Sequence, residues 1–521
     1  MSPLLLLACN GEPEPLDEVL ERGEVPAFDA PAPVLRRLTQ EQYTNSLDDL
    51  FGEGLVLPKL EPDIELEGLY ALGAAVTSAS PYGVEQYESA AFSVAEQVMA
   101  ERSDLALSCE PEGLDDEACA SQSLGELGRR VWRRPLTQGE LDVLVDLVLV
   151  ASETLEDFDA GYEYGIAALL QSPHFLYRIE GGSDGAYTDW EMATRLSYFL
   201  WNTTPDEELL LAAEAGELTD DAGLAAQVDR MLEDERAQDG VRNLFAELWS
   251  LYELDELSKD PTLFLHMSDQ VGPSAREETL LGVEHLVFDL DGDYTTIFTT
   301  RTTFLDRTMA ALYEVPAPER EGFGETELPK EGGRRGFLGQ ASFLALQAHP
   351  VSTSVTKRGQ FLRERVLCHI IPPPPSDVDT SIPEASDAAP TMRERVARHL
   401  EDPSCASCHE ITDPVGLGLE NFDGIGRWRS EENGVAIDPS GDVDGDAFAT
   451  AWELGGVIAA HPDLGPCLVE RTTQYATGNV SQSRELMNWH EDGFEIEGNR
   501  VLFLLRDVAL SPAFRQVGGV E

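Results

Sequence analysis

The stretch Leu35-Arg-Arg-Leu-Thr-Gln-Glu-Gln-Tyr43 marks the start of a helix and sets the fold class that the sequence predicts. Thr39 is followed three residues later by Gln42, the spacing of a capping box that satisfies backbone N–H groups at a helix N-terminus. Apolar residues then continue at helical spacing. These residues are Leu47, Leu50 and Phe51. The segment therefore predicts an amphipathic helix.

Helical patterns recur along the rest of the chain. Pro135 breaks one helical block, and Thr137 with Glu140 restarts the next in the same capping pattern. A larger helical bundle is expected over 188–315, and a short hairpin over the turn-rich stretch 430–446. The sequence thus predicts a mostly α-helical, multi-domain protein of helical bundles with a short β-hairpin.

Shifts in composition and pattern divide the chain into seven predicted segments. They are a lipoprotein-like signal over 1–9, an acidic Pro-rich linker over 10–33, an N-terminal helical domain over 34–108, a helical domain with an Arg-Arg-Pro-Leu-Thr element over 109–185, a large helical bundle over 186–316, a domain with a His-Pro loop and a Cys-x-x-Cys-His motif over 332–430, and a C-terminal helical domain over 431–521.

The charge balance excludes polyanions as the main partners of this protein. The 521 residues include 97 acidic and 36 basic side chains, which give a formal net charge of -61. Such a surface repels nucleic acid and anionic lipid. An acidic coat that keeps an exported protein soluble is the simpler interpretation, and cationic or divalent partners are the alternative.

The first residues, Met1-Ser-Pro-Leu-Leu-Leu-Leu-Ala-Cys9, resemble the end of a bacterial lipoprotein signal, whose cysteine is lipidated after cleavage. No basic residue precedes the apolar run, so a start further upstream and an accidental likeness are the alternatives. No later segment reaches the roughly 18 apolar residues of a membrane span. We therefore expect an exported protein, periplasmic or on the outer cell surface, that contacts the membrane only through Cys9.

The motif Cys405-Ala-Ser-Cys408-His409 carries the chemistry of the chain. Two thiols at this spacing can add to the two vinyl groups of a haem, while the imidazole of the next residue reaches the iron. A redox dithiol favours a βαβ context, and a zinc site of this type needs a second cysteine pair nearby. Neither accompanies the motif, so it predicts one covalently attached haem c with His409 as the proximal iron ligand.

The second axial ligand of that iron has three candidates. His349, in a polar loop between predicted helices, is the first choice, Met487 is the second, and His461 is the third. Arg358 and Arg427 are candidate partners of the haem propionates, because a guanidinium group matches carboxylate geometry. A surface or core role is the structural alternative for each of these side chains.

The remaining cysteines fit two disulfides. Once the cysteines assigned to lipid and haem are set aside, four of the seven remain. Cys109 and Cys119 flank an acidic loop and are expected to pair, which leaves Cys368 and Cys467 to pair by elimination. Buried free thiols are the alternative.

Two Asp-rich stretches imitate the start of a calcium loop, at Asp442–Asp446 and Asp289–Asp293. In both, the glycine stands at the fourth position, whereas a calcium loop needs it at the sixth. We interpret both stretches as turns.

Several stretches together resemble a known family. They are Arg36–Asn45, Arg129–Thr137, Ala193–Asn202 with Pro205–Leu210, Gly336–Gln340 with His349-Pro350, Thr353-Ser354 and Lys357–Gly359, then Cys405–Gly416 with Leu419–Asp423 and Gly426–Trp428, and finally Ser511–Phe514. The chain is similar to planctomycete-type and myxobacterial exported proteins, which consist of successive domains of unknown function and end in a cytochrome-c-like segment.

The resemblance implies export, a haem and electron transfer, but it implies no substrate. Residues 479–490 depart from the family pattern, which weakens Met487 as an iron ligand. Asp413, Pro414 and Asp423 match the family motif, and we expect them to shape the turn after the haem helix.

We therefore expect an exported c-type haem protein that transfers single electrons, or a haem-dependent component of an oxidoreductase, with a redox partner protein at the cell envelope. No catalytic residue is assigned, because no nucleophile elbow, phosphate loop or metalloprotease helix is present in the sequence. The alternative is a cell-surface scaffold with an accessory haem segment that binds polysaccharide or another envelope protein, with Trp190, Trp201 and Trp249 as a stacking surface. Tryptophans are more often core residues than such a platform.

Overall fold

The computed structural model describes residues 22–372, 384–397 and 403–519. Helices dominate it, and the sheets among the described residues are four two-stranded antiparallel pairs. The prediction of a mostly α-helical fold is confirmed. Cys9, the predicted signal over 1–9 and part of the predicted linker lie outside the described residues. Among those residues, no helix combines the length and the apolar character needed to cross a bilayer.

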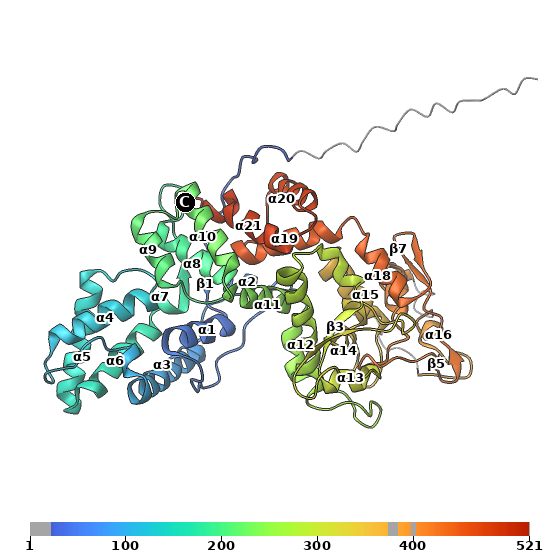
Figure 1. The fold of residues 1–521 in the computed structure, drawn as a ribbon, viewed down its shortest axis with the longest axis horizontal. Coiled ribbons are helices and arrows are strands. Elements are labelled where there is room, and N and C mark those ends of the chain that lie inside the picture. The colour runs from blue at the N-terminus through green and yellow to red at the C-terminus, as the bar shows by residue number, and fades with distance from the viewer. Residues whose placement is uncertain (1–21, 373–383, 398–402, 520–521) are drawn as a thin grey trace, which may run out of the picture.

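The first lobe holds the elements between residues 35 and 179, at the left of Figure 1. They are β1 (Leu35–Arg37), α1 (Gln40–Phe51), α3 (Pro81–Glu101), η1 (Ser103–Leu105), α4 (Glu117–Val131), α5 (Gln138–Leu155), α6 (Phe158–Gln171), α7 (Pro173–Leu176) and β2 (Tyr177–Ile179). The two predicted capping boxes, at Thr39 and Thr137, are present at the starts of α1 and α5. β1 and β2, the first and last elements of this lobe, pair antiparallel and so join its two ends.

One hydrophobic core fills this lobe. It runs from Leu38 to Tyr198 and draws on residues of both helical segments predicted over 34–108 and 109–185. Tyr43, Tyr87 and Phe175 meet at its centre, with ring centroids 5.5 and 5.6 Å from that of Tyr43. The two segments therefore pack as one unit.

The middle of the molecule combines helices from three separate parts of the chain. They are α2 (Tyr70–Gly73), α8 (Asp189–Leu200), α9 (Glu207–Ala215), α10 (Asp221–Glu233), α11 (Arg236–Leu248) and η2 (Leu251–Glu256), with α19 (Leu464–Thr477), α20 (Arg484–Ile496), α21 (Val501–Leu510) and α22 (Pro512–Arg515). In Figure 1, α19–α21 (red) lie at the top beside α10 and above α11.

Two buried arginines attach the C-terminal helices to the earlier ones. Arg195 in α8 donates from Nε to Phe514 O at 3.0 Å. Arg36 in β1 donates to Tyr475 O and Ala476 O at 3.0 and 2.8 Å. Each guanidinium thus binds backbone carbonyls of the C-terminal helices from an element much earlier in the chain. The last helices are therefore part of the central core.

The second lobe lies at the right of Figure 1 and runs from α12 to α18. Its helices are α12 (Val271–Glu284), η3 (His285–Asp289), η4 (Tyr294–Phe298), α13 (Arg307–Tyr313), η5 (Phe337–Gly339), α14 (Ala341–Leu346), α15 (Val355–Phe361), η6 (Leu362–Val366), α16 (Met392–Val396), α17 (Pro403–Leu417) and α18 (Ala451–Ala459). Its strands are β3 (Thr302–Leu305), β4 (Gly324–Glu327), β5 (Glu431–Glu432), β6 (Val435–Ala436), β7 (Gly441–Val443) and β8 (Asp446–Phe448).

The hairpin expected over 430–446 is present as two short hairpins, β5–β6 and β7–β8. Asp444 and Gly445, both with positive φ, connect β7 to β8. Two central residues with positive φ are typical of a tight hairpin turn whose twist matches the strands. The calcium-like stretch at Asp442–Asp446 is therefore a hairpin turn.

Helices α15 and α17 approach each other closely, and glycine makes this possible. A Cβ at Gly359 would lie 1.9 Å from Thr412 O, and one at Gly416 would lie 1.8 Å from Val355 O. Each helix thus supplies one glycine that lies against the backbone of the other. This contact fixes α17, which carries the cysteine motif, against α15.

Candidate functional site

Helix α17 positions the residues of the cysteine motif. Cys405, Cys408 and His409 all lie within α17, and residues three or four apart are neighbours along a helix. Cys408 Sγ lies 3.5 Å from Pro372 O, and its side chain is half-buried. The motif is therefore held on a regular helix at the edge of the packed second lobe.

His409 is oriented by the next turn of the same helix. Its Nδ1 lies 2.8 Å from Asp413 Oδ2, and the Asp413 side chain is 3% exposed. Thr356 in α15 donates to the other carboxylate oxygen at 3.0 Å, which holds the carboxylate in place. The hydrogen bond to Asp413 raises the pKa of His409, partly offset by burial. A carboxylate at Nδ1 fixes the tautomer that presents Nε2 to a metal.

The sequence did not reveal this role of Asp413. We expected Asp413 and Pro414 to shape the turn after the haem helix, and this was wrong because α17 continues to Leu417 and includes both. The i, i+4 spacing of His409 and Asp413 is the signal that could have identified the pair. Asp423 does shape a turn, since its Oδ1 accepts from the N–H groups of Ile425 and Arg427 at 2.9 Å each.

His349 lies in the loop between α14 and α15. Its N–H donates to Ser352 O at 2.9 Å, and Lys259 Nζ donates to Ala348 O at 2.7 Å. Burial, with the charges of Lys357 and Lys259, lowers the pKa of His349, which favours the neutral imidazole that a metal requires. The loop leads directly into α15, whose Thr356 contacts Asp413. His349 itself lies before α15, and Thr353 of the same loop donates to Glu420, just beyond the C-terminal end of α17, at 3.0 Å.

The other two candidate axial ligands have different surroundings. Met487 is buried in α20 within the large central core. His461 Nε2 lies 3.0 Å from Asp444 Oδ2, and its Nδ1 accepts from the Asp463 N–H at 3.2 Å. Asp444 also accepts from Arg363, which donates to Ile411 O in α17.

The two predicted propionate partners differ in their surroundings. Arg358 is fully buried and donates to four backbone carbonyls, those of Leu344, Leu419, Phe422 and Asp423, at 2.8 to 3.2 Å. Burial lowers the pKa of Arg358 to about 10. This packing favours a structural role that clamps the chain after α17. Arg427 lies at the surface and pairs with Glu314 at 2.5 Å.

The structure joins the remaining cysteines in two disulfides. Cys109 pairs with Cys119, and Cys368 with Cys467, with Cα–Cα distances of 5.7 and 5.3 Å. The second disulfide links the segment after η6 to α19, and thereby the second lobe to the middle of the molecule.

The tryptophans considered for a stacking platform do not form one. Trp201 and Trp249 are 1% and 2% exposed, and Trp190 packs against the same core. Trp249 stacks on Phe337 with centroids 4.0 Å apart. The interpretation of these residues as core is the one that the packing supports.

Four family models match successive parts of the chain, and all describe proteins of unknown function. They are DUF1587 (PSD3) over residues 36–100, DUF1595 (PSD5) over 119–180, DUF1592 (PSD4) over 187–315 and DUF1588 (PSCyt3) over 334–432. Comparison with curated proteins and with solved structures gave no match.

Fold and site together define a mostly α-helical protein of successive domains, with a Cys-x-x-Cys-His helix in its C-terminal half. The chain belongs to the planctomycete-type family that combines PSD and PSCyt domains in this arrangement, with PSCyt3 as the last of the four. The PSCyt3 match includes the cysteine motif, Asp413 and the His349 loop.

Proposed function

We propose that this chain is an exported c-type haem protein that passes single electrons at the cell envelope. The observation that carries the proposal is α17, where Cys405, Cys408 and His409 share one helix and Asp413 holds the imidazole. The name of the PSCyt3 family hints at a cytochrome-like domain over the same residues, which supports the proposal.

Attachment requires only the two thiols of the motif. Each S–H adds across one vinyl C=C, so that a carbon–sulfur bond forms and the thiol hydrogen moves to the neighbouring vinyl carbon. No electron is gained or lost. His409 supplies Nε2 to the iron, and Asp413 accepts the hydrogen bond from Nδ1–H.

Electron transfer uses the chemistry that the haem supplies when bound, a one-electron change between ferrous and ferric iron. A reduced partner protein gives the electron and an oxidised partner takes it. The chain's own residues would hold the ring: the thiols would anchor it, His409 would bind its iron, and the α15–α17 contact would keep the motif helix in place. A second protein ligand would complete the coordination of the iron, and His349 is the first candidate that the sequence offers.

Two features support an exported location, with the lipid anchor at Cys9 as part of the same proposal. Disulfides persist in oxidising compartments, and the structure contains two. The lipoprotein-like start that ends at Cys9 predicts the same compartment.

The cofactor test uses the full chain produced with a cytochrome c maturation system. We expect a pyridine haemochrome spectrum with two thioether links, and one haem mass added to the peptide that spans 405–409. Cys408→Ser should lose the two-thioether spectrum, whereas the neighbouring control Ser407→Ala should retain it. Colourless protein from a strain that matures a reference cytochrome would overturn the proposal.

Electron transfer is tested separately by a redox titration of the matured protein. A reversible one-electron transition supports the proposed role. An iron that cannot be reduced and reoxidised reversibly would leave a haem protein that does not transfer electrons.

A further inference from the structure

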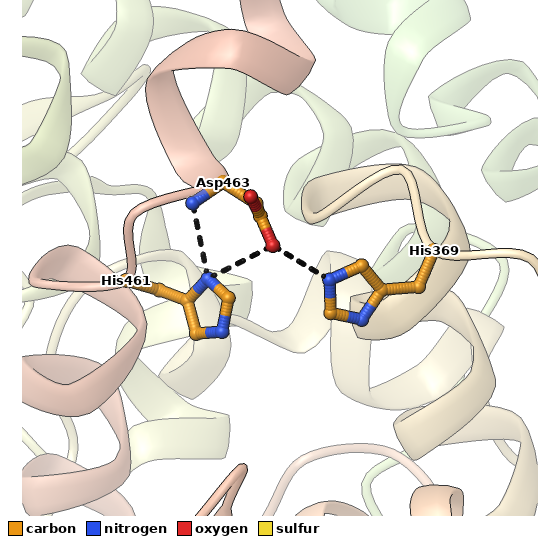
Figure 2. Close-up of side chains that lie close together, drawn as sticks. All are labelled: His369, His461 and Asp463. Atoms are coloured by element: carbon orange, nitrogen blue, oxygen red, sulfur yellow. Dashed lines mark hydrogen bonds and ion pairs between the residues drawn. The ribbon is translucent and has the colours of Figure 1, made fainter.

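A second group of metal-binding side chains lies where η6 ends and α19 begins (Figure 2). His369, His461 and Asp463 point toward a common centre. Asp463 Oδ2 lies 2.9 Å from His369 Nε2 and 3.8 Å from His461 Nδ1, and the three ligand atoms lie within 4.8 Å of one another. Tetrahedral zinc ligands at their usual bond lengths are about 3.3 Å apart. Small side-chain movements would therefore bring these atoms to one ion.

The tautomer of His461 already suits a metal at Nδ1. The Asp463 N–H donates to Nδ1 at 3.2 Å, so this nitrogen carries the lone pair, and Nε2–H faces Asp444 Oδ2 at 3.0 Å. A histidine ligand whose second nitrogen donates to a carboxylate is the usual arrangement around protein-bound metals. Asp444 thus orients the His461 ring through Nε2, the nitrogen that does not face the proposed ion.

Arg363 is the basic group beside this cluster. Its Nη1 donates to Asp444 Oδ2 at 2.6 Å and lies 3.3 Å from His369 Nδ1. When a metal takes Nε2 of His369, Nδ1 carries the ring proton, so the contact to Arg363 must lengthen. The shorter bond from Arg363 to Asp444 can remain. The Asp444 carboxylate then partly neutralises the positive charge of Arg363 near the metal ion.

A disulfide holds the ligand-bearing segments together. His369 follows Cys368 directly, and the partner Cys467 lies in the first turn of α19, just after Asp463. The bond therefore restrains two stretches that are far apart in the sequence, which lowers the entropy lost when both bind one ion.

The ligand set selects the class of ion. Two imidazole nitrogens and one carboxylate suit zinc and similar divalent transition metals, whereas calcium and magnesium prefer oxygen ligands. Asp463 is 52% exposed and His369 28% exposed. Solvent can therefore complete the coordination, as in zinc sites with three protein ligands and one water.

We propose that His369, His461 and Asp463 bind one divalent transition-metal ion, zinc foremost, with Asp444 as the residue that orients His461. None of these ligands belongs to α17, although the cluster borders that helix: Arg363 contacts both His369 Nδ1 and Ile411 O, and Cys408 Sγ lies 3.5 Å from Pro372 O. Zinc binding by these three side chains requires no haem.

The test uses the full-length, matured protein after treatment with a chelator, with zinc alone as the probe. Isothermal titration is expected to show one zinc ion per chain, lost in both His369→Gln and His461→Gln. Asp444→Asn should weaken the affinity by roughly 10- to 100-fold, the usual effect of removing such a second carboxylate. Zinc should also raise the melting temperature of the parent protein.

The matched control is His285→Gln, which removes another histidine–aspartate pair. His285 Nδ1 lies 2.8 Å from Asp289 Oδ2, and this pair is not part of a three-ligand group among the described residues. This variant should bind zinc like the parent, and Cys408→Ser should do so as well. The proposal is overturned if the parent binds no zinc, or if both histidine variants keep the parental affinity while their circular dichroism shows a folded chain.

Discussion

At the scale of single residues, Asp413 is the side chain that orients His409, the proposed iron ligand. It lies one helical turn after His409 and is held by Thr356 from the adjoining helix. A buried carboxylate at Nδ1 gives the imidazole partial imidazolate character, which makes it a stronger donor to iron. A stronger donor stabilises the ferric state and lowers the reduction potential.

Asp413→Asn tests this role. The amide removes the negative charge, so we expect the midpoint potential of the haem to rise and the pKa of His409 in the haem-free chain to fall toward its ordinary value. Spectroelectrochemistry measures the first quantity and NMR titration the second. Asp423→Asn is the control, since Asp423 binds backbone N–H groups of a turn. A potential that stays the same in Asp413→Asn would show that the carboxylate does not tune His409.

The motif itself could be predicted at this scale, because it is local. Cys405, Cys408 and His409 are contiguous in sequence. The surroundings of Arg358 could not be predicted, because its carbonyl partners are distributed over residues 344–423. Nor could the grouping of His369 with His461, which depends on how η6 and α19 pack.

At the scale of helices, the starts of α1 and α5 were predictable because a capping box is defined by four consecutive residues. The C-terminal extent of α17 was not predictable, since Pro414 lies inside the helix and proline usually signals a helix end. Just beyond the proline, Gly416 lies against Val355 O of α15. This is a tertiary contact, which the local sequence pattern does not indicate.

Gly359→Ala tests the contact between α15 and α17. The added methyl group would meet Thr412 O, a backbone atom that cannot rotate away. We expect a loss of about 1–3 kcal/mol in the free energy of unfolding, together with a lower yield of attached haem. Chemical denaturation followed by circular dichroism measures the stability.

Gly456→Ala in α18 is the matched control for this substitution. No atom lies within 4 Å of the position its Cβ would take. Alanine in an open helical position stabilises by up to about 1 kcal/mol. Equal destabilisation by the two substitutions would contradict the proposed close approach.

At the scale of the whole molecule, Glu247 lies at the junction of three segments. Its Oε2 accepts from Ala71 N–H at 2.9 Å, and Asn243 Nδ2 lies 3.3 Å from its Oε1 and donates to Tyr475 OH at 2.6 Å. Burial raises the pKa of Glu247 from 4.5 to about 8. The folded protein therefore keeps a proton that the unfolded chain loses at lower pH.

This shift predicts how stability depends on pH. The contribution of Glu247 is fully present below pH 4.5 and is lost as the pH rises to about 8, at no more than about 1.4 kcal/mol per pH unit. Glu247→Gln should flatten this decline, as measured by urea unfolding between pH 5 and pH 8. The exposed residue Glu256, changed to Gln, is the control. Parallel pH profiles for Glu247→Gln and the parent would contradict the prediction.

Because the C-terminal helices pack into the middle of the molecule, the chain cannot be cut after the last family match without disrupting the core. The family matches end at residue 432, yet α19–α22 belong to the same core as α8 and α10, and Phe514 and Tyr475 lie against buried arginines from the first half. A fragment cut at the last family boundary would expose that apolar surface to water. A fragment meant to fold must therefore extend to α22, so that the middle of the molecule keeps its core.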